Sequence, residues 1–500
     1  MKNTEITSKE TLKLTTIVGL IFFIVNVITL KWYPLPWLDE VVMTDPVVNY
    51  LLTGKLYDTT WIYGTVYPPL YQLLLFGWLK IFGFGIIEVR SLNLVIAFLT
   101  SVILFFSLNK YRILKSKTAL ISALLIFWGS NLFTWMMRNG RVDLLTMLLV
   151  LVLFLSFYYF FKDRNRFTFP YITALFIPIA GLQTIPFVFF IIAFCFFALK
   201  EYRRVIFKFS LITFLGFLTG VILMLLFFYN FNLLEGFIVN TFFMSKSLMS
   251  IISHLNIVDL NNYNEVYPSG LFLEKLFKAY LSNKEYLLLM VANTVIISLL
   301  FFKRKIITNS LGLYLYLFAL ATPLLMTFLA GRYMYTYTWM GFVLSIILII
   351  YLIDKYQSKL KSYIFIVFSL ILFTAYPYNF VRNKYESNTK LSTFIKKQNF
   401  KKSDYILSCS QTYYDIRIIT SNLYFYTFTL YNHEKPLIQV DPARTDTTLR
   451  QKINFVIYNP TDIGAEIIMD EITAYKKEGV NIVLKDSLKS PDVFVYQIIK

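Results

Sequence analysis

The sequence contains few of the residues that build metal sites, disulfides or water-soluble surfaces. Its 500 residues include only two cysteines and two histidines, and 15% of them are charged. Cys195 lies in an apolar run and Cys409 in the C-terminal part, so we expect no disulfide framework and no His-rich metal site. Hydrophobic residues make up 57% of the chain, which leaves too little polar surface for a water-soluble protein. The composition therefore predicts a membrane protein.

Acidic residues are also scarce, and the resulting net charge of +19 is unevenly distributed. Residues 380–500 hold 17 basic and 13 acidic residues, whereas the preceding part of the chain holds 31 and 16. Basic clusters recur in short loops between apolar runs, at 110–117, 162–166, 200–208, 303–305 and 355–361. Cytoplasmic loops of membrane proteins carry such an excess. We therefore interpret the charge as membrane topology and expect no nucleic-acid partner.

The apolar runs predict about eleven transmembrane helices. Residues 14–30 are too long for a signal-peptide core, so we expect a retained first span with the N-terminus inside. The expected spans are 14–30, 88–109, 118–136, 142–161, a hairpin within 167–200, 206–229, 286–302, 308–329, 333–353 and 362–379. Residues 68–84 would reverse the side of every later basic loop if they crossed. We expect a re-entrant or surface-lying helix there.

The predicted fold is a polytopic α-helical membrane domain at 1–379, followed by an extracytoplasmic α/β domain at 380–500. An odd number of spans places this tail and the loops 31–87 and 230–285 on the outer face. Short β-rich runs and helical patterns alternate in the tail. The expected strands are Tyr405–Ser408, Leu423–Phe428, Asn454–Tyr458, Asn481–Leu484 and Val493–Ile499, and the expected helix is Ile463–Lys477.

Three acidic residues on the outer face are candidates for chemistry. Asp39 and Glu40 follow the first span by a few residues, and Asp143 opens a later apolar run. A partly desolvated carboxylate near cations at a membrane surface is suited to take a proton from an attacking hydroxyl. An acid at the start of an apolar run usually pairs with a cation or forms a site. The other interpretation of Asp39-Glu40 is an acidic pair in a solvated loop.

Several short motifs share this outer face and occur in a characteristic order. They are Asp39-Glu40, Gly54-Lys55-Leu56-Tyr57, Tyr67-Pro68-Pro69-Leu70-Tyr71, Arg90, the run Arg138-Asn139-Gly140-Arg141-Val142-Asp143, and Gly331-Arg332-Tyr333. In this order the motifs resemble the GT-C superfamily of membrane glycosyltransferases. The similarity is to the protein O-mannosyltransferases and the lipid A aminoarabinose transferases in particular. It covers roughly the first 350 residues, and the outer α/β tail is similar to the same subgroup.

The resemblance implies an inverting transfer of a sugar from a polyprenyl-phosphate donor to an acceptor hydroxyl of a protein, lipid or glycan. Asp39 would be the general base, and Glu40 would hold the acceptor or orient its neighbour. The donor phosphate would lie near Arg90, Arg332, Tyr333 and Arg138, with Asp143 and Tyr67 in supporting roles. Guanidinium groups can stabilise a departing phosphate without an acid. Arg138 has an alternative role, because arginines at a membrane edge often extend toward the interface.

The sequence departs from the aminoarabinose branch at one place. That branch has an acidic residue and a lysine before its Pro-Pro segment, where this chain has Val66 and Tyr67. We therefore expect no metal site built on that acid, although dependence on a divalent metal stays open. The only cofactor-like molecule expected is the lipid-linked sugar donor.

A transporter or lipid flippase with an outer accessory domain would explain the spans equally well. Against it, the expected spans contain no charged residue at mid-membrane and no half-chain repeat. The lack of a usable Asn-x-Ser/Thr sequon and the short cytoplasmic loops favour a multi-pass protein of a bacterial plasma membrane, acting in the cell envelope. The sequence does not identify the sugar or the acceptor.

We predict that reporters fused after Ile62 and after Gly85 both lie on the outer face, because the flanking basic loops remain inside. Paired alkaline phosphatase and green fluorescent protein fusions measure this. Fusions at Lys115 provide the cytoplasmic control. Opposite signals from the two outer fusions would mean that residues 68–84 cross the membrane.

Overall fold

The computed structural model describes the N-terminal helices and most of the tail. The described residues are 5–32, 34–56, 69–110, 114–149, 151–152, 167–180, 203–234, 237, single helical positions between 287 and 348, 388–425, 449–462 and 465–499. The predictions for Tyr67, Arg332, Tyr333 and most of the loop 230–285 lie outside these residues, as does the domain boundary at 380.

Three of the described helices are long and apolar enough to cross a membrane. They are α1 (Ser8–Thr29), α4 (Ile86–Lys110) and the Phe207–Asn230 part of α10 (Arg203–Asn230), with mean hydropathies of 2.1, 2.2 and 2.6. A further candidate span is the pair α5 (Lys117–Gly129) and α6 (Asn131–Met137), which bends by 58°. The total of eleven spans stays a prediction, because most of the later ones lie outside the described residues.

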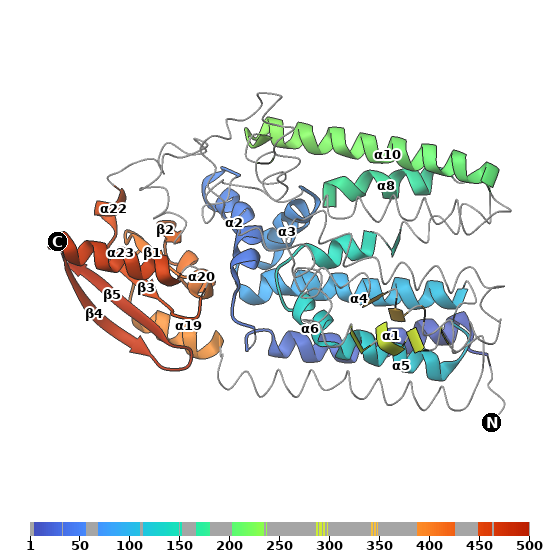
Figure 1. Cartoon of the computed structure of the whole chain (residues 1–500), viewed down its shortest axis with the longest axis horizontal. Helices are drawn as coiled ribbons and strands as arrows, with labels where there is room; N and C mark the ends of the chain where they lie inside the picture. The colour runs from blue at the N-terminus through green and yellow to red at the C-terminus, as the bar shows by residue number, and fades with distance from the viewer. Residues whose placement is uncertain are drawn as a thin grey trace.

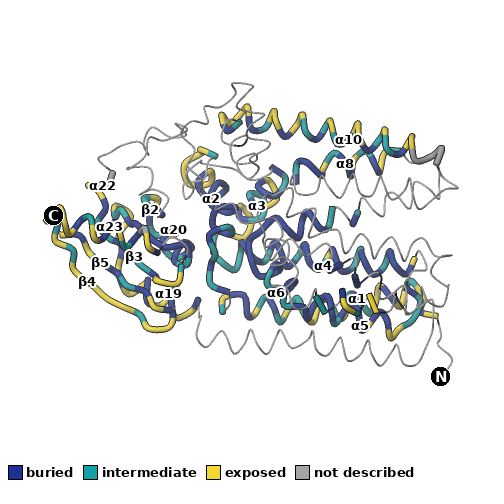
Figure 2. The backbone as a smooth tube through the Cα atoms, in the orientation of Figure 1, coloured by how far each residue is buried: buried dark blue, intermediate teal, exposed yellow. Residues whose placement is uncertain are grey.

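The sides of α1 and α10 that point away from the rest of the protein expose apolar side chains, which a water-soluble protein would bury. Ile24 and Ile28 of α1 are 54% and 60% exposed, and Leu226 of α10 is 51% exposed. Exposed residues follow α10 along its length in Figure 2. Its other side packs on α8 (Thr168–Ala180), which runs beside it in Figure 1. Lipid is the solvent that accommodates such faces.

The loop 31–87, expected on the outer face, contains a helix that the sequence pattern did not predict. Helix α2 (Leu38–Thr53) carries Asp39 and Glu40 in its first turn, where unpaired backbone N–H groups favour negative charge. It ends at Gly54, whose φ of 75° is accessible mainly to glycine. Most of its residues are buried, including the run Val41–Asn49. The helix is therefore an internal element of the fold.

The apolar segment expected to lie in or on the membrane surface forms α3 (Pro69–Phe82). Proline suits the first position of a helix, where its missing N–H is not needed. Fourteen residues reach about 21 Å, which is less than the roughly 30 Å of a bilayer core. The length of α3 agrees with a helix that does not cross, and its topology stays a prediction.

The tail forms a five-stranded sheet in the order β2-β1-β3-β5-β4. Strand β1 (Ile406–Ser408) pairs in parallel with β2 (Leu423–Phe425) and with β3 (Phe455–Tyr458). Strand β5 (Val493–Ile499) pairs antiparallel with β3 and with β4 (Asn481–Leu488). The helical elements are α19 (Asn388–Lys397), η4 (Ser410–Thr412), α20 (Tyr413–Arg417), α22 (Leu449–Lys452) and α23 (Ala465–Lys477). Each strand overlaps a strand expected from the sequence, and α23 overlaps the expected helix.

The tail lies against one end of the helical part, beside α2 (Figure 1). The elements η4 and α20, which follow the end of the parallel strand β1, both contact α2. This arrangement brings residues near position 413 next to residues near position 45. The location of the tail outside the cytoplasm stays a prediction.

Candidate active site

A fully buried ion pair joins α2 to α4. Arg90 donates from Nε to Glu40 Oε1 at 2.7 Å and from Nη2 to Oε2 at 2.8 Å, and both side chains are 0% exposed. Its Nη1 donates to the carbonyl of Pro34 at 2.8 Å, just before α2. The backbone N–H of Gly140 donates to Glu40 Oε1 at 2.9 Å. Such a two-point contact fixes position and angle, and the extra hydrogen bonds offset the cost of burying the charges.

A second charge cluster lies beside this pair. Arg141 donates from Nη1 to Asp39 Oδ2 at 2.5 Å and from Nε to Asp143 Oδ2 at 2.7 Å. Its guanidinium carbon also lies 5.1 Å from the ring centre of Trp37 and 5.5 Å from that of Trp135. Charge pairing and the two aromatic faces together hold the guanidinium in one place.

The side chains of this cluster differ in their access to solvent. Asp39 is 23% exposed, whereas Arg141 is 3% exposed and Asp143 is 2% exposed. Glu40 is completely buried. Asp39 is therefore the carboxylate of this group that a molecule outside the protein can reach.

The turn that carries Arg141 is held from three sides. At its start, Arg138 donates to Asn26 Oδ1 at 3.1 Å and to Thr29 Oγ1 at 2.6 Å, both on α1. Asn93 of α4 donates to the carbonyls of Asn139 and Arg141. The third contact is the hydrogen bond from the turn to Glu40 of α2. The turn is consequently a fixed part of the site.

Gly140 allows this turn to approach α2 and α4 closely. A Cβ atom at this position would lie 2.5 Å from Val89 Cγ1 and 3.3 Å from Glu40 Cγ. The branched side chain of Val89 has little freedom to move away, because its χ1 is restricted in a helix. Any larger residue would separate the turn from Glu40.

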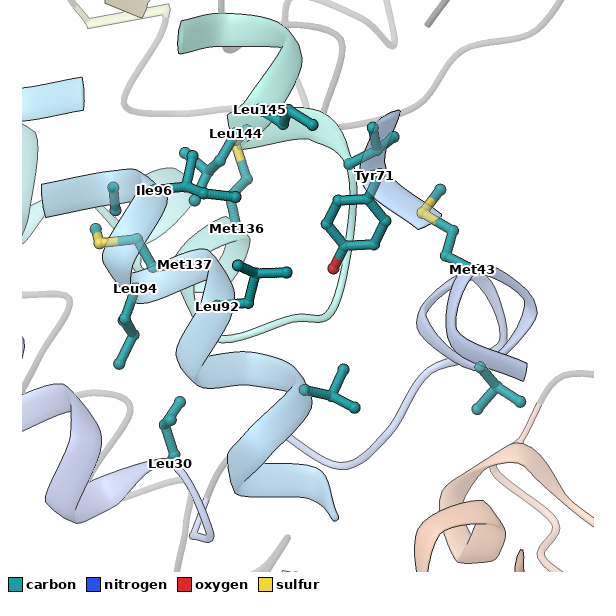
Figure 3. Close-up of a cluster of buried hydrophobic side chains, with 14 of the residues drawn as sticks. Leu30, Met43, Tyr71, Leu92, Leu94, Ile96, Met136, Met137, Leu144 and Leu145 are labelled. Carbon is teal, nitrogen blue, oxygen red and sulfur yellow. The ribbon is translucent and has the colours of Figure 1, made fainter. Parts of the chain in front are cut away.

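Electrostatics in the cluster follow from its burial. Burial alone would lower the pKa of Arg141, but the carboxylates of Asp143 and Asp39 outweigh this effect and raise it, so the guanidinium stays charged. Burial, together with Glu40 and Asp143, raises the pKa of Tyr71 on α3. Figure 3 shows the Tyr71 ring between Met43 and Leu92, with its hydroxyl directed away from α3. Within the described part of the chain this hydroxyl has no hydrogen-bond partner.

The structure brings together Asp39, Glu40, Arg90 and Asp143, which are separated by up to 104 residues in the sequence. Arg90, expected to face a donor phosphate, instead has its guanidinium buried against Glu40. Arg138, expected in the same role, donates to α1. These geometries favour structural roles for both arginines.

Arg141 is the residue of the site that sequence reasoning missed. It stands two residues before Asp143, inside the motif that drew attention to Arg138. Its partner Asp39 lies 102 residues away, and no local pattern indicates that distance. Within the described residues, no group of three or more His, Cys, Asp or Glu side chains is arranged to hold a metal ion.

No protein-family model and no curated protein sequence matches this chain. Solved structures do match, among them ArnT from Cupriavidus metallidurans bound to undecaprenyl phosphate and the same protein in the apo state. The first has a TM-score of 0.54 at 11% identity, and the second has 0.47 at 10%; each match covers 97% of both chains. At this identity the first match shows the fold alone. The chain therefore has the overall fold of ArnT, one of the proteins that its motifs resemble.

We predict that Gly140→Ala lowers the free energy of unfolding by about 1–3 kcal/mol, because the added methyl group overpacks the contact with Val89 and Glu40. Thermal unfolding of the detergent-solubilised protein measures the change. Gly77→Ala is the matched control, since a Cβ there meets nothing within 4 Å and alanine favours the helix. Equal melting temperatures for the two variants would contradict the close approach.

Proposed function

We propose that this protein is an inverting glycosyltransferase of the GT-C type, which moves a sugar from a polyprenyl-phosphate donor to an acceptor hydroxyl. The observation that carries the proposal is a single partly exposed carboxylate, Asp39, at the edge of a buried ion network. The fold supports it, because the similar ArnT structure was solved with undecaprenyl phosphate. The basic loops favour the outer face of a bacterial plasma membrane as the place of reaction.

In the proposed reaction Asp39 acts as the general base. Its Oδ2 accepts from Arg141, which leaves Oδ1 to take the proton of the acceptor hydroxyl. The acceptor oxygen then attacks the anomeric carbon from the side opposite the phosphate, while the bond between that carbon and the phosphate oxygen breaks. The products are the glycosylated acceptor, the polyprenyl phosphate and protonated Asp39, which returns its proton to solvent.

Arg141 and Asp143 prepare Asp39 for this step. A carboxylate on a first helical turn has several rotamers, and only some of them point at the acceptor. The ion pair with Arg141 selects one rotamer, and Asp143 together with two tryptophan rings fixes Arg141 in turn. A base held in one geometry contributes more to the rate than a mobile one.

The departing phosphate needs a cation other than those described in the site. Glu40 neutralises Arg90, and the group Asp39, Arg141 and Asp143 carries a formal charge of −1. A second anion next to such a group would be repelled. We therefore assign the phosphate to Arg332, assisted by Tyr333, as the sequence resemblance implies. Tyr67 keeps its proposed supporting role, and Arg138 is assigned to anchoring the turn.

The rival function is translocation of a lipid without chemistry. The GT-C fold along 97% of the chain favours transfer, since it is the fold of a transferase. Neither the sugar nor the acceptor follows from the site. A panel of radiolabelled polyprenyl-phosphate sugars in proteoliposomes separates the functions, because a transferase releases free lipid phosphate and a flippase leaves the donor intact.

We predict that Asp39→Asn lowers the transfer rate by roughly a hundredfold to ten-thousandfold, because the amide keeps the shape but cannot accept a proton. Membrane insertion and donor binding should stay normal. The measurement is product formation by purified protein at saturating donor. Asp470→Asn, on the exposed face of α23, is the matched control and should behave as wild type. Transfer by Asp39→Asn at the wild-type rate would rule out Asp39 as the base.

Glu40→Gln should act on stability first. The change leaves the Arg90 guanidinium buried without a counter-charge, which typically costs about 3–5 kcal/mol. Chemical unfolding in detergent measures the loss, with Glu466→Gln on the surface of α23 as the control. An unchanged unfolding midpoint for Glu40→Gln would contradict the structural role of this pair.

A further inference from the structure

A buried polar cluster joins the tail to α2. Tyr413 of α20 donates its hydroxyl to Asp45 Oδ1 at 2.8 Å, and Arg417 Nε lies 3.3 Å from the same oxygen. Arg417 also donates from Nη2 to Asn49 Oδ1 at 3.1 Å. None of these four side chains is more than 2% exposed. We call Asp45, Asn49, Tyr413 and Arg417 the docking cluster.

The docking cluster is more than a surface contact. An exposed ion pair contributes little to stability, whereas removing one partner of a buried pair is strongly destabilising, because the other charge is left unpaired and out of water. Each of its two hydrogen bonds, Tyr413 to Asp45 and Arg417 to Asn49, joins residues that are 368 positions apart in the sequence. The tail is thus fixed to one specific turn of α2.

Two further tail residues touch the region around Asp39 and Glu40. Asn388 donates to the Pro34 carbonyl at 2.7 Å, and this is the oxygen that also accepts from Arg90. The Tyr414 ring lies 5.8 Å from that of Phe84, just before α4. The tail therefore contacts the chain on both sides of the two candidate acids.

Helix α2 depends on such external support. Its N-cap residue, Trp37, provides no side-chain cap. Pro46 lies inside the helix and lacks the N–H that would donate to the preceding turn. The docking cluster binds at Asp45, directly beside this weak point. A helix of 16 residues with these defects is ordered by its packing partners more than by its own hydrogen bonds.

We propose that the tail is part of the catalytic machinery: Tyr413 and Arg417 are positioning residues that hold α2 so that Asp39 remains against Arg141. This role rests on the proposed function. Loss of the docking cluster lets α2 shift, and a shift on the order of 1 Å at a catalytic base costs about a hundredfold in rate. Because the proposed function assigns the donor phosphate to Arg332 and not to the docking cluster, we expect donor affinity to be largely retained.

The test compares Tyr413→Phe and Arg417→Gln with wild type, in full-length protein reconstituted in proteoliposomes. Tyr413→Phe removes the hydrogen bond to Asp45 and keeps the ring. We expect kcat to fall by about tenfold to a hundredfold in each variant, with the KM for the polyprenyl-phosphate sugar changed by less than about threefold. Tyr405→Phe is the control, since the ring of this residue stacks on Tyr424 within the tail.

A rescue experiment separates positioning from simple loss of folding. Asp45→Asn leaves Arg417 without its counter-charge, and combining it with Arg417→Gln gives a neutral pair that can still hydrogen-bond. We expect the double variant to exceed Asp45→Asn in kcat at a temperature where all variants are folded. Wild-type kcat in both tail variants, or losses that follow only the folded fraction, would overturn the role of the tail. Absence of transfer by wild-type protein with every donor would instead overturn the proposed function, and this role with it.

Discussion

The complete burial of Glu40 and Arg90 is the constraint on which the rest of the site depends. Two opposite charges at 0% exposure must meet each other and fill their remaining hydrogen bonds from the protein. The pair therefore fixes three segments at once: the chain before α2 through Pro34, the start of α4 through Arg90 itself, and the turn at Gly140. Asp39 directly precedes Glu40 on α2, so its position follows from that of Glu40.

The charges of the site form two groups, a fully buried pair and a cluster with one partly exposed carboxylate. Glu40 and Arg90 cancel each other out of reach of solvent. Arg141 connects two carboxylates, of which one is buried and the other is partly exposed. Asp39 and Glu40 are adjacent in the sequence but have different surroundings, because consecutive helical residues point in directions about 100° apart.

Much of the fold follows from the sequence because local patterns determine it. The tail strands appear where apolar runs of strand length occur, since a sheet buries alternating or continuous apolar residues. Helix α2 escaped prediction because it is buried nearly all round and its valines follow no single face, and because Pro46 argues against a helix. The order of the motifs predicted Asp39, Glu40, Arg90 and Asp143 as residues of the site. The pairing of Arg141 with Asp39 spans 102 residues, and only the folded structure shows it.

The distance in sequence between the two halves of the docking cluster has a consequence for how the protein is made. At synthesis rates of roughly 5–20 residues per second, the 368 residues between Asp45 and Tyr413 correspond to about 20–70 seconds. During that time the carboxylate of Asp45 has neither Tyr413 nor Arg417 as a partner, and the ribosome is still delivering membrane helices. The segment that carries Asp39 is synthesised early, but its contacts with the tail form last. A chain that ends before residue 413 thus carries all of the N-terminal acids and arginines of the site and lacks the two tail residues that contact Asp45. The contacts that hold α2 are therefore complete only after the tail has been synthesised.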